Sequence, residues 1–174
     1  KFQRIIKEAH DANIMFLIQQ ANIRASELNS DIIKEFNLLV KDINADQKGK
    51  LMENIEVSAY ASPDGGFDLN DKLAEQREKN AAGYVDKQLK KDKIETNVDS
   101  KYTAQDWEGF KELVSKSNIQ DKDIILRVLS MYQDPEQRET EIKNISSVYK
   151  DLADEILPQL RRARLTLNYQ LIGR

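Results

Sequence analysis

The order of apolar and polar residues predicts alternating strands and helices over the first 100 positions. The apolar run "ANIMFLIQ" (Ala12–Gln19) predicts a buried strand. After Ser30 or Asp31 as N-cap, apolar residues recur at intervals of three and four as far as Ile43, which predicts a helix. Residues 55–60 then alternate, as expected for a strand with one buried face.

A second strand–helix–strand sequence follows. The strand 55–60 is predicted to end in a turn at Pro63–Gly66, and a helix is predicted from Leu69 to about Lys90. The segment "KIETNVDSKY" then has the composition of a third strand. Two strands joined by one helix predict parallel pairing with a right-handed crossover.

Residues 103–157 have a mostly helical pattern, and a strand is predicted after them. Thr103 is the expected N-cap of the first of these helices, Pro135 is expected in the first turn of another, and Pro158 is expected to end the last one. The alternation in "RLTLNYQLI" predicts the final strand. The prediction is therefore one α+β domain over residues 1–174.

Arg77 occupies an unexpected place in the helix after the turn. An advance of about 100° per residue puts Arg77 and Asn70 on the same face as Leu73, Ala74 and Ala81, which must pack. An unpaired buried guanidinium costs several kcal/mol, so Arg77 must form an internal salt bridge, reach water or line a pocket. The turn before the helix favours the pocket, because free N–H groups at a helix start attract carboxylates.

Composition narrows the choice of ligand. The chain has 174 residues, 33% of them charged, and a net charge of −3, so we expect no nucleic-acid or membrane-surface partner. Without cysteine and with His10 as its one histidine, it offers no thiolate or histidine pair, and we expect no metal or cofactor. We find no signal peptide and no apolar run of about 20 residues, and expect the chain to be part of a longer protein whose anchor lies outside it.

The spacing around Arg77 resembles a known signature. A strand followed by Gly65, Asn70, Leu73 and Arg77 is similar to the signature of the OmpA-like peptidoglycan-binding domain, shared with Pal and MotB. Four fixed residues at these spacings would occur together by chance at about one sequence position in 10⁵. The segment "LRRARLTL" also looks like the family's paired arginines before the last strand. The resemblance covers about residues 12–100 and 158–169.

The resemblance implies a fold and a function. The fold would be OmpA-like, β-α-β-α-β-(helical insertion)-β, with a mixed sheet of about four strands packed against helices and residues 103–157 as the insertion. The function would be non-catalytic binding of the diaminopimelate of the peptidoglycan stem peptide, in the periplasm. The parent protein would be attached to the outer membrane through regions outside this chain.

The family's ligand residues carry over incompletely. The family grips the ligand with an aspartate and an arginine, and Ser62 stands at the aspartate's position here. Two nearby acids are candidates to meet the ligand's ammonium instead. The predicted ligand-binding residues are Ser62, Asp64, Asp68, Asn70, Arg77, Arg161 and Arg162.

Two alternative functions remain open at this stage. An OmpA-like scaffold without wall binding would act through contacts with other envelope proteins, and residues 103–157 would supply its new surface. An enzyme would need an acid–base pair or metal ligands from Asp64, Asp68 and Asp71, but acids at a helix start are ordinary dipole partners. The wall-binding hypothesis places Arg77 open at the rim of a cleft, whereas an enclosed Arg77 would favour the scaffold.

Overall fold

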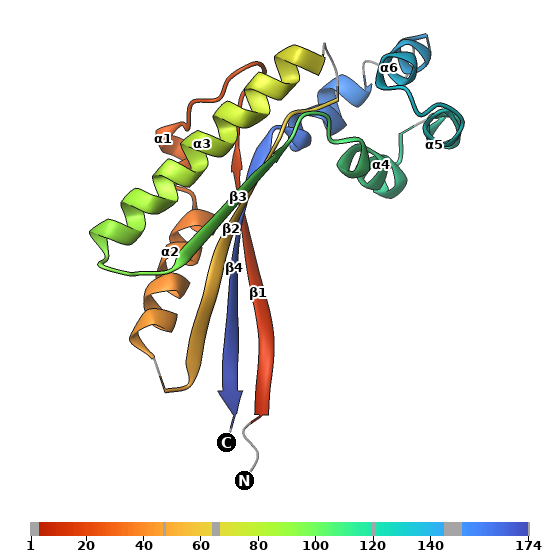
Figure 1. Ribbon diagram of the computed structural model, residues 1–174. Coiled ribbons are helices and arrows are strands. Elements are labelled where there is room, and N and C mark those ends of the chain that lie inside the picture. The colour runs from red at the N-terminus through yellow and green to blue at the C-terminus, as the bar shows by residue number, and fades with distance from the viewer. Residues whose placement is uncertain (1–3, 47, 64–66, 120, 145–150, 174) are drawn as a thin grey trace.

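The fold is a four-stranded mixed sheet with helices packed on one face (Figure 1). This computed structural model describes residues 4–46, 48–63, 67–119, 121–144 and 151–173. The strands lie in the order β1-β4-β2-β3; β2 and β3 are parallel, and β4 runs antiparallel to β1 and β2. Their bounds are β1 Arg4–Met15, β2 Lys50–Tyr60, β3 Asn97–Thr103 and β4 Arg162–Gly173. The predicted α+β class and the parallel strand–helix–strand unit are confirmed.

Two helices cover the inner face of the sheet, α2 (Asp31–Ala45) and α3 (Phe67–Lys91), and the one-turn helix α1 (Ala25–Leu28) precedes them (Figure 1). The predicted cap of α2 is confirmed, because the Ser30 side chain accepts a hydrogen bond from the Ile33 N–H at 3.4 Å. A further bond joins the two long helices, since Asn37 Nδ2 donates to the Tyr84 hydroxyl at 3.0 Å.

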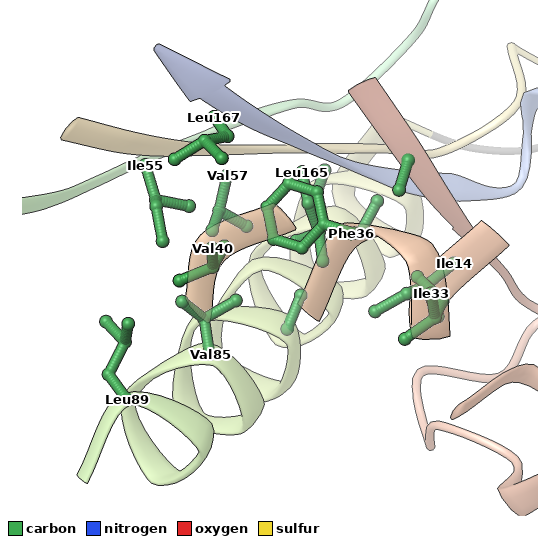
Figure 2. Packing of buried hydrophobic residues seen from close by; sticks show 14 of the residues in the cluster. Ile14, Ile33, Phe36, Val40, Ile55, Val57, Val85, Leu89, Leu165 and Leu167 are labelled. Atoms are coloured by element: carbon green, nitrogen blue, oxygen red, sulfur yellow. The ribbon is translucent and has the colours of Figure 1, made fainter. Parts of the chain in front are cut away.

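The main core forms between this face and the helices. Alternate residues of the strands point inward, and residues spaced by three and four on α2 and α3 meet them (Figure 2). Every one of these side chains is removed from water, which is the principal favourable contribution to folding. Representative members are Ile14, Phe36, Val57, Val85 and Leu165.

The opposite face of the sheet, here called the outer face, is polar along its middle. Asn168 Nδ2 donates to Asn54 Oδ1 at 2.9 Å, and Asn54 Nδ2 donates to Asp99 Oδ2 at 2.7 Å. On the other side of β4, the Thr166 hydroxyl donates to Asp11 Oδ1 at 2.7 Å. The two faces therefore differ as the alternation of apolar and polar residues predicted.

The described residues between β3 and β4 are mostly helical and form a second apolar cluster beyond the strand ends, away from the termini (Figure 1). Side chains such as Phe110, Ile125, Leu129, Leu152 and Leu160 build this cluster. The described elements are α4 Trp107–Lys116, α5 Lys122–Met131, α6 Pro135–Lys143, the π-helical turn η1 Leu152–Ile156 and the 3₁₀ turn η2 Leu157–Leu160. Pro135 occupies the first turn of α6, as predicted.

Two predicted helix ends in this region are wrong. Thr103 is the last residue of β3, and Asp106 caps α4 instead, accepting a hydrogen bond from the Gly109 N–H at 3.0 Å. Pro158 does not stop the chain's helical course, because it lies inside the 3₁₀ turn that continues to Leu160. Proline is compatible with this place, since the first turn of a helix needs no N–H donor.

The burial of Leu165 on the central strand β4 predicts a large loss of stability on truncation. Leu165→Ala should lower the free energy of unfolding by about 2–5 kcal/mol, because it leaves a cavity in the main core. Urea denaturation measures this value. Leu38→Ala is the matched control: Leu38 is 58% exposed, so the change should stay within about 0.5 kcal/mol. Equal losses in the two variants would contradict the core described above.

Candidate functional site

Arg77 lies at the centre of the region that the sequence singled out. It sits on the packed face of α3, as the helical periodicity predicted, together with Asn70, Ala74 and Ala81. Its side chain is 0% exposed and is among the largest fully buried side chains of the described residues. The Phe16 ring lies 5.1 Å from the guanidinium carbon, close enough for a cation–π contact.

Main-chain carbonyl groups bind the Arg77 guanidinium. Its Nε–H donates to the Gln20 carbonyl oxygen at 2.9 Å, and Nη1 donates to the Tyr60 carbonyl oxygen at 2.9 Å. Nη2 donates to the Leu17 carbonyl oxygen at 3.2 Å. The side chain thus joins the segment after β1 to the end of β2.

The same contacts explain why β1 is not the predicted strand Ala12–Gln19. The strand runs over Arg4–Met15. After Phe16 the chain turns: the Gln20 N–H donates to the Leu17 carbonyl oxygen at 3.1 Å, and Gln19 has a positive φ of 57°. This turn directs the Leu17 and Gln20 carbonyls toward Arg77, which an extended strand paired along its length could not do.

The expectation that Arg77 lies open at the rim of a cleft is wrong for this structure. The guanidinium is enclosed, and three chain carbonyls already accept its N–H groups. Two acids that could reach this region are placed elsewhere: Glu78 accepts from the Ser100 hydroxyl at 3.2 Å, and Glu56 lies on the outer face. A buried cation held this way positions the backbone around it.

The other predicted residues near the turn are divided between interior and surface. Ser62 and Asn70 are buried, at 7% and 5% exposure, and both are engaged in polar interactions. Asp68 is exposed in the first turn of α3, where an acid is favoured by the helix dipole. Asp64 and the glycine of the motif, Gly65, lie outside the described residues.

The three arginines around the start of β4 differ in position, as the alternation of side chains along a strand requires. Arg162 and Arg164 point to the outer face, where their guanidinium carbons lie 4.5 Å and 5.9 Å from the centre of the Tyr60 ring. Arg161 precedes the strand and is partly buried. Arg162 and Arg164 also line a groove of about 620 Å³ between the outer face and α4. Of the predicted residues that the structure describes, Arg162 is the one that lines this groove.

Asp106 is a residue of the groove that sequence reasoning missed. Its Oδ2 lies 3.3 Å from Arg162 Nη2, which is ion-pair distance, and its Oδ1 caps α4. Backbone bonds fix its position, because the Asp106 N–H donates to the Ala61 carbonyl oxygen and the Ala61 N–H donates to the Thr103 carbonyl oxygen, each at 3.2 Å. Aspartate is a favoured N-cap residue, but Thr103, three positions earlier, is a favoured one as well.

Burial dominates the electrostatics of Asp106. Removal from water raises the pKa of its carboxyl group, and the Gly109 N–H and the Arg162 and Arg164 guanidinium groups lower this pKa in part. At the rim of the groove, the Lys116 ammonium lowers the pKa of Glu112, to which it is bound at 2.9 Å. The groove therefore carries two ion pairs, at its base and at its rim.

Known proteins give little further information. No protein-family model matches the chain, and no curated protein matches it. Among solved structures, the OmpA-like domain of FopA1 from Francisella tularensis subsp. tularensis SCHU S4 is similar, with a TM-score of 0.45 and 16% identity over 97% of this chain and 78% of that chain. A likeness at this level carries no argument about function, which must come from the residues themselves.

Two negative findings concern the described residues alone. None of their helices combines the length and the apolar character that crossing a membrane requires. Nor do they bring three or more His, Asp or Glu side chains together in a way that would hold a metal ion.

The role of Arg77 predicts a severe effect of its removal. Arg77→Met should lower the free energy of unfolding by at least about 3 kcal/mol, because it removes the hydrogen bonds by which the buried guanidinium joins the Leu17, Gln20 and Tyr60 carbonyl groups. Urea denaturation measures the loss. Lys79→Met, on the exposed side of the same helix, should change stability by no more than about 0.5 kcal/mol. A loss below about 1 kcal/mol for Arg77→Met would refute the structural role.

The cap of α4 predicts opposite effects at two glycines. In Gly109→Ala the new Cβ would overlap Asp106 Oδ2, so the carboxylate must leave its cap and ion pair, at a cost of about 1–2 kcal/mol. In Gly83→Ala the Cβ meets nothing within 4 Å, and α3 should gain about 0.5–1 kcal/mol. Thermal denaturation of both variants tests the pair. Stabilisation by Gly109→Ala would show that Asp106 is not held as described.

Proposed function

We propose that this chain is a non-catalytic, OmpA-like module of the cell envelope that binds the stem peptide of peptidoglycan. In this role it tethers its parent protein to the cell wall from the periplasm. The observation that carries the proposal is the succession of β2 and α3, in which Asn70 and Arg77 lie on the packed face of the helix at the spacing of the family motif. The predicted element order around this unit supports it.

The proposal gives the predicted residues different roles. Arg77 is a positioning residue, because its N–H groups already bind chain carbonyls. Carboxylates of the stem peptide, including those of diaminopimelate, are bound by cations at the start of β4, Arg161 and Arg162. The exposed Asp68, and Asp64 as the sequence predicts, meet the ammonium group, while the buried Ser62 and Asn70 support the backbone before and within α3.

A second function has its own supporting observation. The helical region between β3 and β4 has an apolar cluster separate from the main core, as expected of a part that offers its own binding surface. The enclosure of Arg77 also suits a scaffold that no longer binds the wall. In this alternative the module acts through contacts with other envelope proteins.

Retention on purified sacculi tests the first function. The wild-type chain should sediment with sacculi that contain diaminopimelate, and less with sacculi that contain lysine in its place. Asp68→Asn should weaken retention about tenfold, since one charge-assisted contact is lost. Asp86→Asn, an exposed change on the same helix, is the matched control and should leave retention unchanged.

The outcome also separates the two functions. If wild-type protein stays in the supernatant, wall binding is ruled out. Cross-linking of an envelope protein that disappears when residues 104–160 are deleted would then favour the scaffold.

A further inference from the structure

The groove between α4 and the outer face has cations without acid partners. The Arg162 side chain is 11% exposed and forms an ion pair with Asp106. Arg164 is half-buried, and no carboxylate of the described residues lies within ion-pair distance of it. Lys111 lines the same groove. The described lining of the groove has four cations, Lys111, Lys116, Arg162 and Arg164, and three acids, Asp106, Glu108 and Glu112, so one positive charge is in excess.

Two residues that line the groove carry buried donors for which the described residues supply no acceptor. Among the described residues, Arg162 Nε and Trp107 Nε1 are buried without a hydrogen-bond acceptor. The Arg162–Asp106 contact does not compensate for this, because Asp106 Oδ2 lies at ion-pair distance without hydrogen-bond geometry. Buried polar groups are nearly always satisfied, so unused donors of this kind indicate a ligand or ordered water.

The Tyr60 ring holds both guanidinium groups in place. The Arg162 and Arg164 guanidinium carbons both lie within 6 Å of its centre, which limits the conformations of two long side chains. Because this ordering is complete before binding, a ligand loses less free energy to side-chain ordering. Two planar guanidinium groups side by side match carboxylate oxygens, which each can bind in a bidentate manner.

We infer that this groove, with Arg164 as its principal contact and Arg162, Tyr60 and Trp107 beside it, is the site that receives a peptide carboxylate. This inference rests on the proposed function in taking the carboxylate to be that of the stem peptide. It assigns the role expected of Arg77 to a different face of the sheet, where α4 from the helical region forms one wall. The groove volume of about 620 Å³ is within the usual range for a ligand of several groups.

Calorimetric titration tests the inference with soluble probes. The wild-type chain should bind a stem tripeptide containing diaminopimelate, and the same tripeptide with its carboxylates amidated should bind at least about tenfold more weakly. Arg164→Gln should weaken binding about 10- to 100-fold, and Arg164→Lys should restore part of it, since lysine keeps the charge without the fork. Arg127→Gln, an exposed change on α5 with the same loss of charge, should bind as the wild type does.

The results separate this inference from the proposed function. Equal binding by Arg164→Gln and wild type, or equal binding of the amidated peptide, overturns the groove as the carboxylate site even if sacculi retain the chain. A capped peptide of glutamates is the second probe. Another outcome is that the glutamate peptide binds through Arg164 while the chain binds neither sacculi nor the tripeptide. In that case the groove is a carboxylate site whose ligand is a protein, and the proposed wall binding is wrong.

Discussion

The buried guanidinium of Arg77 is the interaction on which this end of the molecule depends. A charge that is removed from water must be surrounded by polar groups, and here the chain supplies three of its own carbonyls. They come from residues 17, 20 and 60 of the sequence, so one side chain of α3 fastens two distant segments. Asn80, one turn later, adds a contact to the Ala21 carbonyl oxygen at 2.7 Å.

This constraint determines what the strand ends can present to a ligand. Because Arg77 holds the Tyr60 carbonyl from the inner side, the Tyr60 ring is fixed on the outer face, where it supports Arg162 and Arg164. Backbone bonds from Ala61 to Thr103 and from Asp106 to Ala61 then place α4 beside these arginines. The inner guanidinium thus organises a groove that it does not itself line.

Much of the fold could be predicted because its signals are local. The alternation in β2 and β4, the Ser30 cap and the helical spacing in α2 and α3 depend on neighbours in sequence, and they specified the sheet, its helices and the packed face that carries Arg77. The opposite orientation of Arg162 and Leu165 followed from the same period of two.

The contacts of the site could not be predicted in the same way. The groups that bind Arg77 and Arg162 lie far away in the sequence, and some of them are main-chain carbonyls. Every residue has a carbonyl group, so the residue types of Leu17 and Gln20 do not mark their carbonyls as acceptors for a side chain about 60 positions away. The end of β1 was misplaced for this reason. Asp106 was missed because its pairing with Arg162 depends on how the helical region packs against the sheet.

The exchange rate of the Arg77 Nε–H with water tests the central claim most directly. Nuclear magnetic resonance resolves this proton in a ¹⁵N-labelled protein, and an enclosed donor bound to the Gln20 carbonyl should exchange only when the domain opens. The account predicts exchange much slower than that of the exposed Arg127. Exchange as fast as that of Arg127 would show that the guanidinium is open to solvent and would contradict the account.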